Sequence, residues 1–175
     1  MTYVTLALRL ALAGVFLVSG LAKARALDET VAMVAVLRKR LWPAGRRLDR
    51  PASWLLVTVE AGTGAALLAG RPLAVPALLA ATALLVGFAA LALAAARSKL
   101  NLTCACFGRP SARLGWRHVW RNLALLGIAV SALAGALAPM AAPSDVAGYA
   151  VAASAALVVT LLCAFYDDIV DLVTG

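Results

Sequence analysis

The sequence has few charged residues, a single histidine and only three cysteines, and each shortage excludes a class of protein. Charged residues make up 14% of the chain and hydrophobic residues 64%, whereas a soluble domain is about a quarter charged and about half apolar. A soluble globular domain is therefore excluded. A lone His118 argues against a closed tetrahedral zinc site. Three cysteines without a secretory cleavage pattern argue against a disulfide-stapled secreted domain.

Five long apolar stretches account for most of the chain, at about 2–22, 52–70, 73–96, 119–138 and 146–165. Each is close to the length of about 20 residues that a helix needs to cross a bilayer. Small residues inside them, as in "GTGAALLAG" and "ALAGALA", allow helices to approach closely. The sequence predicts an all-α fold, a polytopic transmembrane helical bundle, with residues 1–175 forming one integral membrane domain.

The cations are concentrated in two connections. Residues 23–51 and 97–121 together hold 14 of the 16 Lys and Arg residues. With five crossings both connections lie on one side of the membrane, and the positive-inside rule makes that side cytoplasmic, with the N-terminus outside. Cations there would meet lipid head groups, so no nucleic-acid partner is expected. The first connection also predicts an interfacial helix at about 28–40, with basic residues in its last turn.

Two cysteines lie close together in the second connection, in "TCACFGRPS". A disulfide between Cys104 and Cys106 would close a very small, strained and easily reduced ring. Neighbouring cations at Lys99, Arg109 and Arg113 would lower the thiol pKa. The pattern favours thiol exchange, and a two-thiolate site for Cu(I) or another soft metal is the alternative.

Two other residues bear on this chemistry. Cys163 lies alone in the last apolar stretch and is expected to behave as an inert, small hydrophobic residue. His118 titrates in the range needed for a proton acceptor near the thiols. The alternative is a histidine at the membrane interface with no special task.

Two ionisable residues fall inside apolar stretches. A carboxylate such as Glu60 near the middle of a crossing costs about 2.5–3.5 kcal/mol on insertion scales, so it needs a partner or a proton. Arg9 is the candidate partner, and an Arg9–Glu60 contact is predicted, either to join the first two crossings or to handle protons or substrate. Lys23 and Arg121 lie at the ends of crossings, where they could snorkel on the cysteine side of the membrane.

These residues fit a known pattern, and the chain resembles the MauE branch of the MauE/DoxX family of redox-associated membrane proteins over roughly residues 5–135. The family pattern is an N-terminal Arg followed by F-x-x-S-G-x-x-K, then a second-helix Glu, a C-x-C-F-G signature and an Arg-Asn pair. The matching residues are Arg9, Phe16, Ser19, Gly20, Lys23, Glu60, Cys104, Cys106, Phe107, Gly108, Arg121 and Asn122. Ala105 stands where the family usually has Gly.

The resemblance implies a fold and a function. The fold would be a four-helix core, DoxX-like and similar to vitamin K epoxide reductase, with a fifth helix added. The function would be that of a membrane thiol–disulfide oxidoreductase in the bacterial inner membrane, with a thioredoxin-like protein or a client enzyme as partner and a quinone as a possible cofactor. In this family MauE is implicated in maturing methylamine dehydrogenase, a periplasmic enzyme.

Under this hypothesis the residues divide into two groups. The catalytic group would be Cys104, Cys106 and His118, and the pocket would be lined by Arg9, Lys23, Glu60, Phe107, Arg121 and Asn122. Periplasmic disulfide formation would require the cysteines outside, whereas the cation distribution favours the cytoplasmic side. Three alternatives stay open: a soft-metal protein for Cu or Hg, a non-catalytic subunit that scaffolds a partner enzyme, and a small-molecule enzyme on a DoxX-like scaffold.

Overall fold

The computed structural model describes residues 3–41, 48–97, 115–138 and 145–174, and this part of the chain contains helices and no strands. Five of its helices are long and apolar enough to cross a membrane. This confirms the predicted all-α polytopic bundle. The helices are α1 (Tyr3–Arg25), α2 (Leu27–Leu41), α3 (Asp49–Leu68), α4 (Arg71–Arg97), α5 (Trp116–Leu137), α6 (Val146–Ala164) and α7 (Tyr166–Thr174).

Helix α5 begins earlier than its apolar content indicates. It starts at Trp116, just after Gly115, whereas the apolar stretch begins at about residue 119. The first two turns contain polar residues, among them His118 and Arg121, which are buried inside the bundle. Because inward-facing polar side chains can be shielded from lipid by neighbouring helices, hydropathy alone does not locate the start of this helix.

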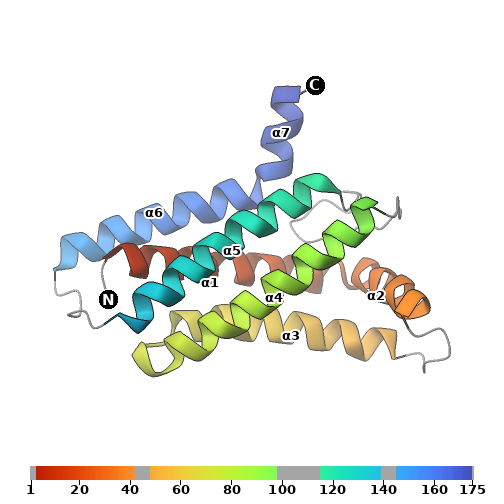
Figure 1. The fold of residues 1–175 in the computed structure, drawn as a ribbon, viewed down its shortest axis with the longest axis horizontal. Helices are drawn as coiled ribbons and strands as arrows, with labels where there is room; N and C mark the ends of the chain where they lie inside the picture. Colours follow the sequence, from red (N-terminus) through yellow and green to blue (C-terminus); the bar gives the residue numbers. More distant parts are fainter. Residues whose placement is uncertain (1–2, 42–47, 98–114, 139–144, 175) are drawn as a thin grey trace.

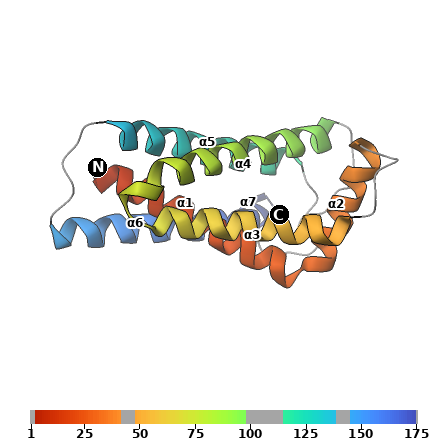
Figure 2. The same ribbon diagram turned by 90° about the horizontal axis from the view of Figure 1, so that it is seen from below.

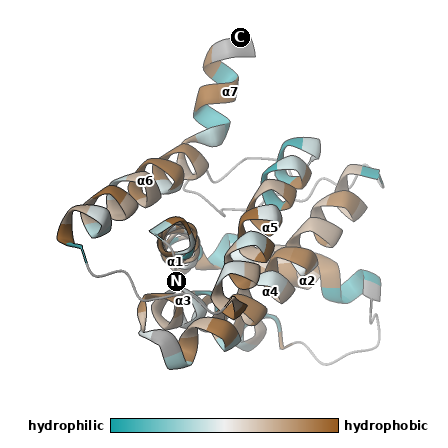
Figure 3. Cartoon of the chain, turned by 60° about the vertical axis from the view of Figure 1, so that its left-hand side comes forward, coloured by the Kyte–Doolittle hydropathy of each residue, from teal (hydrophilic) through white to brown (hydrophobic). Residues whose placement is uncertain are grey.

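Helix α1 is the central element of the bundle. It packs against α3, α5 and α6, while α4 packs against α3 and α5 (Figures 1 and 3). The start of α1 meets the start of α6, where the Tyr3 hydroxyl accepts a hydrogen bond from the backbone N–H of Asp145 at 2.9 Å. The Tyr3 and Tyr149 rings also meet edge to face at 6.2 Å. Helices α1 and α6 therefore run in the same direction, as an odd number of crossings requires.

The opposite end of the bundle carries α2, the end of α4 and the start of α5 (Figures 1 and 2). We call it the basic end, because the cations of the described residues concentrate there: Lys23, Arg25, Arg38, Lys39, Arg40, Arg50, Arg97, Arg117 and Arg121. Hydrophilic residues occur in α2, α4 and α5 at this end, while most of α6 is hydrophobic along its length (Figure 3).

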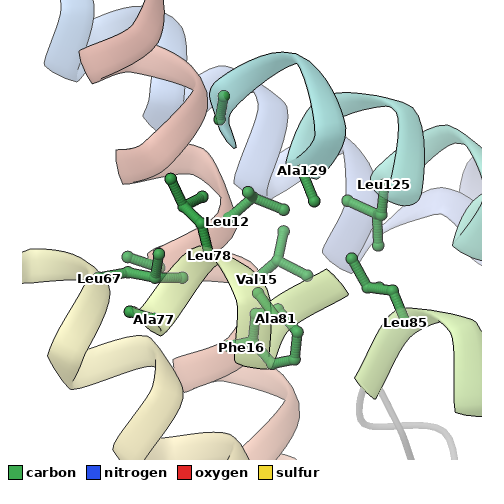
Figure 4. Packing of buried hydrophobic residues seen from close by; sticks show 12 residues of the cluster. Leu12, Val15, Phe16, Leu67, Ala77, Leu78, Ala81, Leu85, Leu125 and Ala129 are labelled. Atoms are coloured by element: carbon green, nitrogen blue, oxygen red, sulfur yellow. The ribbon is translucent and has the colours of Figure 1, made fainter. Parts of the chain in front are cut away.

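The hydrophobic core lies midway along the bundle and joins four helices. Its large members include Leu12 and Phe16 of α1, Leu67 of α3, Leu78 and Leu85 of α4 and Leu125 of α5, all almost fully buried (Figure 4). Within a bilayer such contacts stabilise the bundle through close packing rather than through exclusion of water. The fifth crossing, α6, packs on α1 beside this core.

Close helix contacts depend on glycine. A Cβ atom added at Gly64 of α3 would lie 2.8 Å from Leu17 and 3.1 Å from the carbonyl oxygen of Ala13, both in α1. Gly14 of α1 is similarly covered by Thr160 of α6, whose hydroxyl donates to the Ala11 carbonyl at 3.3 Å. Gly64, one of the small residues noted in the sequence, therefore serves a helix contact within the chain.

Helix α2 crosses the basic end of the bundle rather than following its axis (Figure 2). Met33 packs with Ala92, Ala95 and Val119 of the adjacent helices. The Arg38 guanidinium donates to the Asp49 carboxylate at 2.7 Å and so fixes the end of α2 to the start of α3. The predicted helix at about 28–40 thus forms at Leu27–Leu41.

Candidate functional site

A buried ion pair joins α1 to α3. The ammonium of Lys23 donates to both carboxylate oxygens of Glu60, at 2.7 and 2.8 Å. It also donates to the Ser19 hydroxyl at 2.7 Å, and that hydroxyl donates to Glu60 at 3.2 Å. Lys23 is 1% exposed and Glu60 is fully buried. The three side chains form a closed polar network, as a charge pair taken out of water requires.

The sequence of α1 explains how this network forms. Ser19 and Lys23 are four residues apart and therefore lie on one face of the helix. Gly20 lies between them, and a Cβ there would approach the backbone nitrogen of Ala61 at 3.3 Å. The missing side chain lets α3 come close enough for Glu60 to reach both groups. The S-G-x-x-K element and the second-helix glutamate are thus parts of one site.

The predicted Arg9–Glu60 contact is wrong. Glu60 binds Lys23 and Ser19, and ten residues of continuous helix separate Ser19 from Arg9, which corresponds to about 15 Å along the axis. Arg9 is buried in the other half of α1. The prediction assumed that Arg9 and Glu60 lie at the same depth in the membrane on neighbouring helices. Helix α3 instead begins well beyond the end of α1 at the basic end (Figure 1), so the two residues lie at different depths.

Lys23 does not snorkel, because its side chain turns inward to Glu60. Its ammonium also lies 5.1 Å from the ring centroid of Phe88 in α4, within range of a cation–π interaction. The network is therefore enclosed by three helices, and the aromatic ring covers it from α4. Sequence reasoning missed Phe88, because nothing in its spacing distinguishes it from other core aromatics.

A second polar group lies at the start of α5. His118, Arg121 and Asn122 are all buried, and the Asn122 amide donates to the His118 carbonyl at 2.8 Å. Among the described residues, the His118 Nδ1 atom is buried and has no hydrogen-bond partner. This ring nitrogen is available to a ligand or to a residue outside the described ranges.

Arg121 brings positive charge to the same end of the bundle as Lys23, near enough for the two like charges to repel each other. Its guanidinium donates to Asp167 of α7 at 3.4 Å. Like Lys23, it is buried rather than snorkelling. The predicted residues Lys23, Glu60, His118, Arg121 and Asn122 therefore gather at the basic end, and Arg9 does not join them. Sequence reasoning missed Asp167, which lies in a short acidic tail that gave no indication of its partner.

The cysteines divide between described and undescribed parts of the chain. Cys104, Cys106 and Phe107 lie outside the described residues. The neighbouring described residues are Arg97, which ends α4, and Gly115, which precedes α5, and both helix ends lie at the basic end (Figure 1). Cys163 is a free thiol, half-buried against the hydrophobic core. Across the described ranges, no three His, Cys, Asp or Glu side chains form a group that could hold a metal ion.

These features define a class: a multi-pass helical membrane protein with a buried network of charged residues at one end of its bundle. The chain belongs to the MauE family, because the family model described as methylamine utilisation protein MauE matches residues 1–138. A curated methylamine utilisation protein MauE from Paracoccus denitrificans is 36% identical over 141 residues, covering 79% of this chain and 72% of that protein. No solved structure matches the chain.

Proposed function

We propose that this protein is a thiol–disulfide oxidoreductase of the bacterial inner membrane that uses Cys104 and Cys106. The observation that carries the proposal is the gathering of buried charged and polar residues at the basic end, where α4 ends and α5 begins around the cysteine-bearing segment. Burying Lys23, Glu60 and Arg121 within a membrane bundle is costly. Ionisable residues retained at such a cost mark functional sites by default.

The reaction is an exchange between two cysteine pairs. A thiolate of the partner attacks one sulfur of the Cys104–Cys106 disulfide, and the other sulfur leaves as a thiolate. The second partner thiol, as a thiolate, then attacks the partner sulfur of the mixed disulfide, which forms the partner disulfide and releases the remaining cysteine as a thiolate. The partner becomes oxidised by two electrons, and Cys104 and Cys106 become two thiols. The reverse sequence reduces a partner disulfide by the same steps.

The described residues suggest separate roles in this exchange. His118 offers a buried ring nitrogen that can take the proton of an attacking thiol. Lys23, Glu60 and Ser19 hold α1 against α3, while Arg121 adds positive charge near the start of α5, where it favours a thiolate. A thioredoxin-like protein or a disulfide-rich client enzyme is the fitting partner class, and methylamine dehydrogenase is the client that the family implies.

A membrane quinone is the acceptor class that suits a dithiol inside a bilayer, because it takes up two electrons and two protons. Among the described residues, His118 has a polar atom available to face a quinone oxygen at this end. We propose quinone only as the final acceptor when exchange runs towards disulfide formation.

The proposal is tested by trapping. Cys106→Ser should leave Cys104 in a stable mixed disulfide with its partner, detected as a reducible high-mass band in membranes of cells under oxidising conditions. Cys163→Ser is the matched control and should trap nothing. Failure of both Cys106→Ser and Cys104→Ser to trap any species, while both variants insert normally, would overturn the proposal.

A non-catalytic accessory role is the second candidate, and the geometry of one site favours it. The Lys23–Glu60–Ser19 network is closed, with each charged group satisfied by its neighbours, as expected of a structural contact between helices. An accessory subunit of this kind would support maturation of its client even after Cys104 and Cys106 are both replaced by Ser. Loss of client activity in that double variant would favour exchange chemistry instead.

A further inference from the structure

Helix α7 is tied to α5 by a matched pair of ionic contacts. The Arg117 guanidinium lies 2.6 Å from the Asp171 carboxylate, and Arg121 lies 3.4 Å from Asp167. The two arginines are four residues apart on α5, and the two aspartates are four residues apart on α7. Because residues with this spacing share one face of a helix, the contacts fix which face of α7 is turned to α5.

The opposite face of α7 is apolar and exposed. Phe165, Ile169 and Leu172 follow a spacing of four and then three residues, which places them on one stripe. Their exposed fractions are 54%, 42% and 86%, so the described chain leaves a large part of this stripe uncovered. It continues the exposed surface of α6, where Leu161 and Leu162 face outwards.

We propose that α7 lies along the membrane surface with the stripe Phe165, Ile169 and Leu172 inserted at the boundary between head groups and acyl chains. Helix α7 turns away from the axis of α6 at the end of a membrane crossing (Figure 1). Trp116 and Trp120, in the first turns of α5 at the same end, are also exposed. Exposed tryptophans mark the interfacial depth of a membrane protein, so α7 starts at that depth.

The ionic contacts of α7 make its negative charge compatible with a lipid surface. A helix that lies on an anionic leaflet usually carries Lys and Arg, whereas α7 has three aspartates and no cation. The contacts with Arg117 and Arg121 neutralise two of these aspartates and turn them away from the lipid. The same contacts engage the carboxylates that a basic protein partner would need, so the exposed stripe fits a bilayer better.

Photo-crosslinking in native membranes tests this inference on the full chain. Leu172→p-benzoylphenylalanine should yield a lipid adduct, seen by mass spectrometry as a gain of one phospholipid. Val158 of α6 is 55% exposed on a membrane crossing, and the same replacement there is the positive control. A polypeptide adduct at position 172, or no adduct while position 158 yields one, would overturn the inference.

The orienting role of the ionic contacts has its own test. Asp171→Asn should lower the lipid-adduct yield at position 172 at least twofold, because one of the two contacts is lost and α7 can rotate. Val158 again serves as the reference, since its adduct yield should not change. An unchanged yield at position 172 would show that Arg117 and Asp171 do not orient α7. This readout does not depend on the cysteines, so its failure is distinguishable from failure of the proposed exchange function.

Discussion

The ammonium of Lys23 lies within 2.8 Å of both carboxylate oxygens of Glu60, and neither residue has appreciable solvent exposure. The pair joins α1 and α3 beside Gly20, where an added Cβ would lie 3.3 Å from the backbone nitrogen of Ala61. In a bilayer neither charge has water as an alternative partner, so each depends on the other. The contact therefore fixes both the separation of the two helices and their relative depth.

Removing one member of this pair should be far more harmful than removing both. Lys23→Met leaves the Glu60 charge buried without its partner, and the free energy of unfolding should fall by about 3–5 kcal/mol. The double variant Lys23→Met/Glu60→Leu should recover most of that loss, because no isolated charge remains. Reversible unfolding in mixed detergent micelles measures the free energy of unfolding of the wild type, of Lys23→Met and of the double variant.

An exposed ion pair provides the reference for this experiment. Arg117 and Asp171 have side chains that are 45% and 49% exposed, so Arg117→Gln should cost no more than about 1 kcal/mol. Equal losses in Lys23→Met and Arg117→Gln would contradict the reading of Lys23 and Glu60 as a buried, mutually dependent pair.

Two glycines of α3 should respond in opposite ways to alanine. Gly64→Ala brings a methyl group to 3.1 Å from the Ala13 carbonyl oxygen and should destabilise the protein by about 1–3 kcal/mol. Gly62 has nothing within 4 Å of the same added atom, so Gly62→Ala should be neutral or stabilise the helix by up to about 1 kcal/mol. The same micelle unfolding measurement compares them, and a similar loss in both variants would contradict close packing at Gly64.

The fold was largely predictable from the sequence because lipid imposes a simple rule. A crossing needs about 20 apolar residues, and five stretches of that kind are present. The start of α5 was misjudged because its inward-facing polar residues are shielded by other helices. Mean hydropathy treats every residue of a segment as if it contacted lipid. His118 and Arg121 are instead buried against other helices.

Several of the residues that gather at the basic end could be named from the sequence, but their contacts could not. Lys23, Glu60, Arg121 and Asn122 were identified from the family pattern, yet Glu60 was paired with Arg9. Partner choice depends on the relative depth of α1 and α3 along the membrane normal, and the sequence gives no measure of that offset. Asp167 and Phe88 were missed because each depends on a contact between helices distant in the chain.

The Phe88 ring should contribute measurably to the buried network. Its centroid lies 5.1 Å from the Lys23 ammonium, and a desolvated cation–π contact is worth up to about 2 kcal/mol. Phe88→Leu keeps an apolar side chain of similar bulk but removes the ring, so the free energy of unfolding should fall by about 1–2 kcal/mol. In a Lys23→Met background the same replacement should cost less. If Phe88→Leu costs the same in both backgrounds, the ring acts by packing alone.

Replacing His118 should lower the rate of the proposed thiol exchange while leaving the stability of the protein nearly unchanged. His118→Gln keeps a polar side chain of similar size but removes the group that can take up a proton. The rate at which the oxidised protein accepts electrons from a small dithiol should fall, on the order of 10²-fold for a positioned general base. Trp120→Phe is the matched control, because Trp120 lies in the same part of α5 and is 63% exposed. Both variants should unfold close to the wild-type midpoint, which separates a chemical effect from a structural one. Exchange at the wild-type rate in His118→Gln would assign His118 to the membrane interface with no part in the chemistry.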